Sequence, residues 1–134
     1  MSSTNYYDTF IEVADDCPIE QAEIPVIKND KPTVASMQYD MLFKHPYTYT
    51  SDDVLFTVHA KRNAIKETNA ARAAFFAKGQ ACLRASPLTK RYGWGVHSNT
   101  EGKIAIYPME SADYKKFAKD SKLKHLKAMR ASRK

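Results

Sequence analysis

The segment from residue 79 to residue 97, GQACLRASPLTKRYGWGVH, is the most unusual stretch of the chain in its residue types. It combines cations, hydroxyls, an indole and an imidazole with glycines that expose the backbone. Guanidinium and ammonium groups beside hydroxyls and open backbone N–H groups are typical of sites that hold a phosphate or a carboxylate. We therefore predict an anion-binding site formed by Arg84, Ser86, Lys90, Arg91, Trp94 and His97.

A structural role is the alternative for the same segment. Gly93 and Gly95 can bend a strand or let a neighbouring group come close. Trp94 can then belong to the hydrophobic core, and the cations can be solvated loop residues. The residue types leave both interpretations open.

A small enzyme with its site at the 79–97 loop is a second hypothesis. Cys82 with His97 or His59 would supply a nucleophile and a base. A lone cysteine between alanine and leucine also fits a small buried side chain. The catalytic residues and any cofactor therefore stay unassigned.

The remaining patterns of chemistry argue against a metal or nucleotide site. The four histidines are His45, His59, His97 and His125, and they form no HxH or HxxxH pair and have no CxxC beside them. We therefore predict no metal site. The adjacent carboxylates of Asp52 and Asp53 diverge by about 100° on a helix, so they are better placed to cap it. No Walker A or GxGxxG pattern occurs.

Positive charge is concentrated toward the C-terminal end. Residues 115–134 hold nine Lys and Arg residues and one acid, whereas residues 1–59 hold three lysines and ten acids. Such a segment can contact the phosphates of nucleic acid, and it also fits the solvated face of a helix. The nucleic-acid hypothesis assigns phosphate contacts to Lys115, Lys116, Lys119, Lys122, Lys124, Lys127 and Arg130. A membrane surface fits less well, because the apolar face of this segment is small and lacks Trp and Phe.

The compartment is predicted from what the chain lacks. No apolar run approaches the roughly 18 residues of a membrane-spanning helix, and the first residues do not read as a signal peptide. Cys17 and Cys82 form no CxxC pair. We expect a soluble cytoplasmic protein with two free thiols and no membrane contact.

The elements expected around these residues are short. Residues 6–13 predict a strand, and residues 94–97 and 103–107 predict a hairpin around a five-residue loop. Helices are predicted at 33–44, 52–63, from about Asn69 to an end at Lys78-Gly79, and from Ser111, with prolines holding 18–32 extended.

These elements indicate an α+β fold with a small antiparallel sheet, including the hairpin near 94–107, packed against about four helices. We expect a single compact domain over residues 1–134. A basic helical segment is expected at about 111–131, its apolar face continuing through Leu123, Leu126 and Met129. Strand order and a homo-oligomeric state are left open.

Several short motifs resemble a family of small bacterial proteins classed as a domain of unknown function. They are NYYDTFI at 5–11, HPY at 45–47, DDVLF at 52–56, KGQ at 78–80, CLRASPL at 82–88, KRYGWG at 90–95 and KAMR at 127–130. The resemblance covers nearly the whole chain and implies a single-domain bacterial cytoplasmic protein. It implies no activity, cofactor or catalytic residue.

The function that these observations favour is a small non-enzymatic binding module. Its partner would be an anionic small molecule or a macromolecule. A small enzyme at the 79–97 loop and a nucleic-acid binder acting through the basic C-terminal segment are the alternatives.

Overall fold

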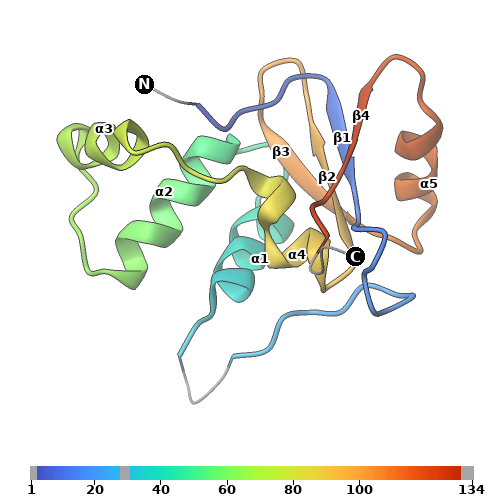
Figure 1. Ribbon diagram of the computed structural model, residues 1–134, viewed down its shortest axis with the longest axis horizontal. Helices are drawn as coiled ribbons and strands as arrows, with labels where there is room; N and C mark the ends of the chain where they lie inside the picture. The colour runs from blue at the N-terminus through green and yellow to red at the C-terminus, as the bar shows by residue number, and fades with distance from the viewer. Residues whose placement is uncertain (1–2, 28–30, 131–134) are drawn as a thin grey trace.

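A four-stranded mixed sheet lies at the centre of the molecule (Figure 1). The computed structural model describes residues 3–27 and 31–130. The strands are β1 (Thr9–Glu12), β2 (Trp94–Ser98), β3 (Ile104–Pro108) and β4 (Lys124–Lys127), in the order β3-β2-β1-β4. Strands β2 and β3 form the predicted antiparallel hairpin and β1 pairs antiparallel with β2, whereas β4 runs parallel to β1. The α+β class is confirmed, but the sheet is mixed rather than antiparallel.

Five α-helices and one 3₁₀ turn complete the described part of the chain. They are α1 (Val34–Lys44), α2 (Ser51–Arg62), α3 (Asn69–Ala77), η1 (Leu83–Ala85), α4 (Pro87–Lys90) and α5 (Ala112–Lys119). Hydroxyl side chains cap the four longer helices, because each accepts a hydrogen bond from a first-turn N–H that has no partner within the helix. These caps are Thr33, Thr50, Thr68 and Ser111. Helix α2 therefore begins one residue earlier than predicted, with Thr50 as its cap.

The two faces of the sheet carry different side chains because residues alternate along each strand. Ile11, Val96 and Ile106 belong to the main core, which also includes Leu42 of α1 and Leu88 of α4. On the opposite face, Phe10 contacts the rings of Tyr114 and Phe117 of α5. In Figure 1, α5 lies on one side of the sheet and α1 and α4 lie on the other.

The prediction of a basic helical segment at about 111–131 is wrong. Helix α5 ends at Lys119, and residues 124–127 form β4, while residue 131 lies outside the described residues. The break occurs because Asp120 Oδ1 accepts a hydrogen bond from the backbone N–H of Lys122 at 2.9 Å, a side-chain turn that competes with helix. The chain then pairs with β1, where the N–H of Lys124 donates to the carbonyl of Asp8 at 2.9 Å.

Helices α2 and α3 form a hairpin at one end of the molecule, at the left of Figure 1. A second, smaller hydrophobic cluster holds them together, made of Phe56 and Ala60 from α2 and Phe76 from α3. The guanidinium of Arg72 spans the pair, with an ion pair of 2.9 Å to Asp53. This cluster is separate from the main core, so α3 covers α2 rather than the sheet.

Candidate functional site

Ser86 of the predicted anion site is buried and used by the fold. Its hydroxyl donates to Gln38 Oε1 at 2.5 Å and accepts from the N–H of Leu88 at 3.1 Å. Ser86 therefore caps α4 and joins it to α1, leaving its hydroxyl without spare donor capacity.

Arg84 and Trp94 hold distant segments together. Arg84 Nε donates to the carbonyl of Lys127 at 2.6 Å, and its own carbonyl accepts from the N–H of Met129 at 2.8 Å. The Trp94 indole N–H donates to the carbonyl of Glu23 at 2.9 Å, and only 4% of the residue is exposed. Both side chains are engaged in backbone contacts that fix β4 and the extended segment before α1.

The other three residues of the predicted anion site do not lie together with Arg84, Ser86 and Trp94. Lys90 is half-buried at the end of α4, and Arg91 is exposed just after it. His97 pairs with Phe10 in the β1–β2 register, so it faces α5. Trp94 lies on the other face against Tyr39 of α1. The sheet therefore separates His97 from Trp94, and the six residues do not line one pocket.

The glycines of this segment receive the protein's own side chains. A Cβ at Gly95 would lie 2.6 Å from Cε2 of Tyr114 and 2.7 Å from Cζ of Phe10. Gly93 has a φ of +80° and lies against Met109 and Ala22. The close approach that these glycines allow is thus used within the fold.

His97 belongs to a polar cluster that the sequence did not predict. Tyr47 Oη lies 2.8 Å from His97 Nδ1 and 2.7 Å from Tyr107 Oη. The imidazole stacks on Phe117 with 4.2 Å between ring centroids. Burial lowers the pKa of His97, although the charges of Asp8 and Asp120 act in the opposite direction. Burial and the Tyr107 hydroxyl raise the pKa of Tyr47, so Tyr47 and His97 are both neutral near pH 7.

Cys82 lies away from both candidate bases. Its Sγ accepts a hydrogen bond from the Tyr6 hydroxyl at 3.2 Å on the side of the sheet that faces α1 and α4. Burial, with a contribution from this thiol, raises the pKa of Tyr6 to about 12. His97 lies on the α5 side and His59 on α2, against Phe75. The structure does not bring Cys82 together with either histidine.

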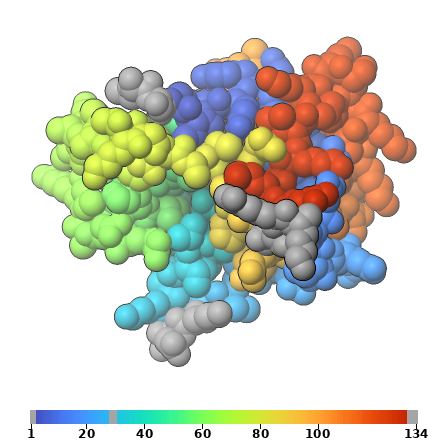
Figure 2. All heavy atoms as spheres, in the orientation of Figure 1, coloured from blue at the N-terminus to red at the C-terminus, as the bar shows by residue number. Residues whose placement is uncertain are grey.

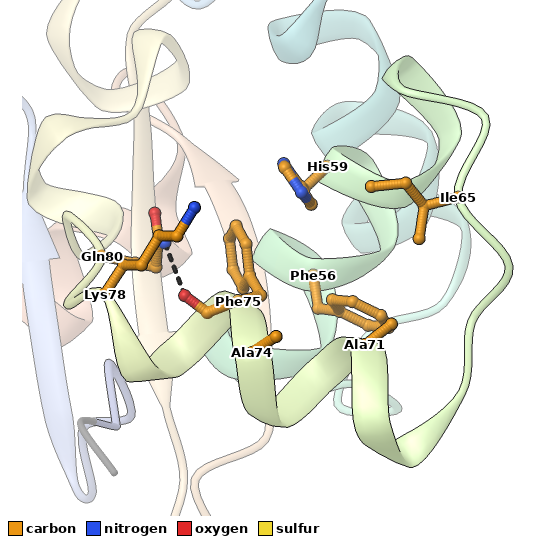
Figure 3. Close-up of a pocket in the computed structure, with 8 residues that line it drawn as sticks. All are labelled: Phe56, His59, Ile65, Ala71, Ala74, Phe75, Lys78 and Gln80. Carbon is orange, nitrogen blue, oxygen red and sulfur yellow. Dashed lines mark hydrogen bonds between the residues drawn. The ribbon is translucent and has the colours of Figure 1, made fainter.

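A pocket of about 330 Å³ opens between α2 and α3 (Figure 3). Five of its lining residues are apolar and three are polar. They are Phe56, Ile65, Ala71, Ala74 and Phe75, with His59, Lys78 and Gln80. Figure 3 shows Lys78 and Gln80 at one end and Ile65 at the other, with Phe75 between them. The pocket therefore has an apolar body and a polar end.

Local sequence features position the polar groups of this pocket. Gln80 Nε2 donates to the carbonyl of Phe75 at 2.7 Å, which satisfies one of the carbonyls left open at the end of α3. Asn63 Nδ2 lies 3.3 Å from Nδ1 of His59. Because an amide nitrogen only donates, Nδ1 of His59 is the acceptor in this contact.

The helix beginning near residue 69 was predicted, but the pocket beside it was not. The available signal was the mixture of sizes on α3, where Ala71 and Ala74 stand on the same helix as two phenylalanines. Small side chains beside large ones leave space against a facing helix. That space becomes visible only once α2 and α3 are known to pack together.

The basic residues of the nucleic-acid hypothesis fall on α5, β4 and the turn between them. Lys115, Lys116 and Lys119 are exposed on α5, and Lys122 and Lys124 follow them on the surface. The remaining two residues of this hypothesis, Lys127 and Arg130, approach the carboxylate of Asp15. Lys127 Nζ lies 2.8 Å from Asp15 and Arg130 lies 3.9 Å from it.

Within residues 3–27 and 31–130, no three His, Cys, Asp or Glu side chains are placed to hold a metal ion. No helix in this part of the chain has the length and hydropathy to cross a membrane.

Comparison with known proteins places the chain in a family. It matches a family of unknown function (DUF6157) over residues 1–134. The chain belongs to this family. No curated protein and no solved structure matches it. This family agrees with the domain of unknown function that the sequence resembles. Because its function is unknown, the family assigns no activity and no site residue to this chain.

Proposed function

We propose that this protein binds a small amphipathic acid, a molecule with an apolar body and one acidic group, in the pocket between α2 and α3. The observation that carries the proposal is the pocket's division into an apolar body and a polar end with a cation (Figure 3). Ligand sites are typically concave, mostly apolar and supplied with a few placed polar groups.

The apolar body sets the size of the ligand. Ligand pockets usually measure roughly 300–1,000 Å³, and this one, at about 330 Å³, is at the small end. Phe56 and Phe75 supply aromatic walls, and Ile65 closes the end away from Lys78. We therefore expect a single ring or a short alkyl chain rather than a nucleotide or a long acyl chain.

The polar end favours an anion over a cation. Lys78 brings an exposed ammonium group to the rim, beside the amide of Gln80 (Figure 3). The carbonyls at the end of a helix normally repel an anion. Here the side-chain amide of Gln80 donates a hydrogen bond to the carbonyl of Phe75. The N–H of Gly79 donates to the carbonyl of Phe76 at 3.2 Å. These bonds reduce the repulsion that an acidic group beside Lys78 would meet.

Binding fits the pocket better than catalysis does. Its lining holds Lys78 and His59 as titratable side chains and no serine, cysteine, aspartate or glutamate. A nucleophile with an adjacent base, or a pair of carboxylates, is therefore missing from the lining. The Tyr47–His97–Tyr107 cluster is distant from these residues, on the α5 side of the sheet.

The test compares three probes of the same chain length by calorimetry. Octanoate, octanol and octylamine share an apolar body and differ in the polar group. We expect octanoate to bind most tightly and to raise the melting temperature. Lys78→Gln should lower the affinity for octanoate about 5- to 10-fold and leave octanol unchanged.

Two variants serve as controls for the position of the site. Ala74→Leu fills the pocket and should weaken octanoate and octanol alike, whereas Lys66→Gln removes an exposed cation that does not line it and should change neither. Equal affinity for octylamine and octanoate, or unchanged binding in Ala74→Leu, would overturn the proposal.

We also propose that the protein works in the cytoplasm. The support is that Cys17 and Cys82 are both free, as is usual in a reducing compartment. Fractionation of cells that express the untagged chain tests this, and recovery with an extracytoplasmic fraction would contradict it.

A further inference from the structure

We infer that the exposed lysines of α5 and of the segment after it bind the phosphate backbone of double-stranded nucleic acid. The lysine surface consists of Lys115, Lys116, Lys119, Lys122 and Lys124. Figure 2 shows α5 and β4, coloured orange-red to red, next to each other at the right of the molecule. This surface lies at the opposite end of the molecule from α2 and α3, so the inference is independent of the proposed small-molecule site.

The charges of the lysine surface are not neutralised by the fold. Within residues 3–27 and 31–130, none of its five lysines makes an ion pair, whereas Lys127 and Arg130 both approach Asp15. The one acid between residues 115 and 124 is Asp120, whose Oδ1 accepts from the backbone N–H of Lys122. Lysines without protein partners retain their counterions, and their release is what drives binding to a polyphosphate.

The packing of α5 favours nucleic acid over a membrane. Its large apolar side chains, Tyr114 and Phe117, contact Phe10 of the sheet. Tyr114 is fixed further, because its hydroxyl accepts from the N–H of Val13 at 3.0 Å. None of the exposed large hydrophobic residues of the described chain lies on α5. A helix bound to a membrane surface needs an apolar face to insert, and α5 has none to offer.

The same packing favours a duplex over a single strand. Binding of single strands relies on exposed aromatic rings that stack on bases, and the rings of α5 are turned toward the sheet. Duplex DNA presents one charge per roughly 1.7 Å of axis, so a lysine surface gains most from it. Lysines contact phosphates without distinguishing bases, so we expect little sequence preference.

The test uses fluorescence anisotropy with a labelled duplex of about 20 base pairs over a salt series. We expect about four phosphate contacts. A plot of the logarithm of the association constant against the logarithm of the salt concentration should then have a slope of about −3 to −4. The quadruple variant Lys115→Gln, Lys119→Gln, Lys122→Gln and Lys124→Gln should bind at least 10-fold more weakly at 50 mM salt. The matched control Lys44→Gln, Lys61→Gln, Arg62→Gln and Lys66→Gln removes the same number of exposed charges elsewhere and should lose less than about threefold.

A second variant separates loss of charge from loss of structure. Arginine at positions 115, 119, 122 and 124 preserves the charge, and we expect affinity within about twofold of the unmodified protein. Absence of binding at 25 mM salt, equal losses in the quadruple variant and its control, or loss in the arginine variant would each overturn the inference. So would binding to phosphatidylglycerol vesicles as strong as to the duplex and abolished by the same four substitutions.

Discussion

The hydroxyl of Tyr47 lies 2.8 Å from Nδ1 of His97, although fifty positions separate the two residues in the sequence. The same hydroxyl lies 2.7 Å from that of Tyr107. Tyr47 reaches this place with a φ of +58°, and its N–H donates to the carbonyl of Ile104 at 2.9 Å. One tyrosine thus joins the loop after α1 to both strands of the hairpin.

We predict that Tyr47→Phe lowers the free energy of unfolding by about 1 kcal/mol, the cost of removing one partner from a hydrogen-bonded pair. We expect no larger loss of stability, because the cluster is half-buried and water can replace part of the lost hydrogen bond. Chemical denaturation measures it. Tyr7→Phe removes a hydroxyl from a side chain that is 56% exposed and should change nothing; equal effects from both substitutions would contradict the role given to Tyr47.

The lowered pKa of His97 predicts acid destabilisation. The folded protein prefers the neutral imidazole, whereas the unfolded chain takes up a proton near pH 6.5. The unfolded state therefore binds more protons below that pH, and stability present above pH 6.5 is lost as the pH falls toward the folded pKa. Urea midpoints at pH 7.5 and 5.5 measure the change. His97→Gln should reduce the difference between the two midpoints, and an unchanged difference would contradict the role given to His97.

We predict that Gly95→Ala lowers the free energy of unfolding by about 1–3 kcal/mol, the usual cost of overfilling a packed region. The added methyl would collide with the rings of Tyr114 and Phe10. Thermal and chemical denaturation provide the measurement. In a Tyr114→Leu background the same substitution should cost less, because one of the colliding rings is absent. Additive effects in the double variant would show that the two residues do not compete for this space.

Strand β4 predicts a difference between two neighbouring apolar residues. Leu126 packs against the main core, so Leu126→Ala should cost about 1–2 kcal/mol, less than a fully buried leucine because it is half-exposed. Met129 is 50% exposed, and Met129→Ala should be close to neutral. Had residues 121–129 continued a solvated helix, the two substitutions would cost similar amounts. Urea denaturation distinguishes the outcomes.

The four longer helices were predictable because their signals are local, whereas α4 was not predicted. Thr33 and Ser111 cap helices at the positions where the sequence places them, and Pro46 follows the end of α1. Strand β4 was not predictable, since its sequence KHLK shows no strand pattern. It exists because its backbone pairs with β1, more than a hundred positions earlier, and no local pattern reports such a partner.

The candidate site shows the same division between local and distant information. Trp94 and His97 are close in sequence, but the alternation of side chains along β2 places them on opposite faces. That period of two was available from the sequence and could have separated them. The pocket between α2 and α3 needed the packing of two helices, and Tyr47 needed the turn that carries it to the sheet.

The parallel pairing of β1 with β4 has a consequence for synthesis on the ribosome. The N–H of Lys124 donates to the carbonyl of Asp8 at 2.9 Å and that of Ala128 to the carbonyl of Glu12 at 2.8 Å, so the first strand gains its partner on this edge only after residues 124–128 have emerged. Such late pairing raises the mean sequence separation of contacts and slows folding. Until β4 has been synthesised, one edge of β1 stays open to strands of neighbouring nascent chains. The pairing of β4 with β1 is therefore the step that completes the sheet.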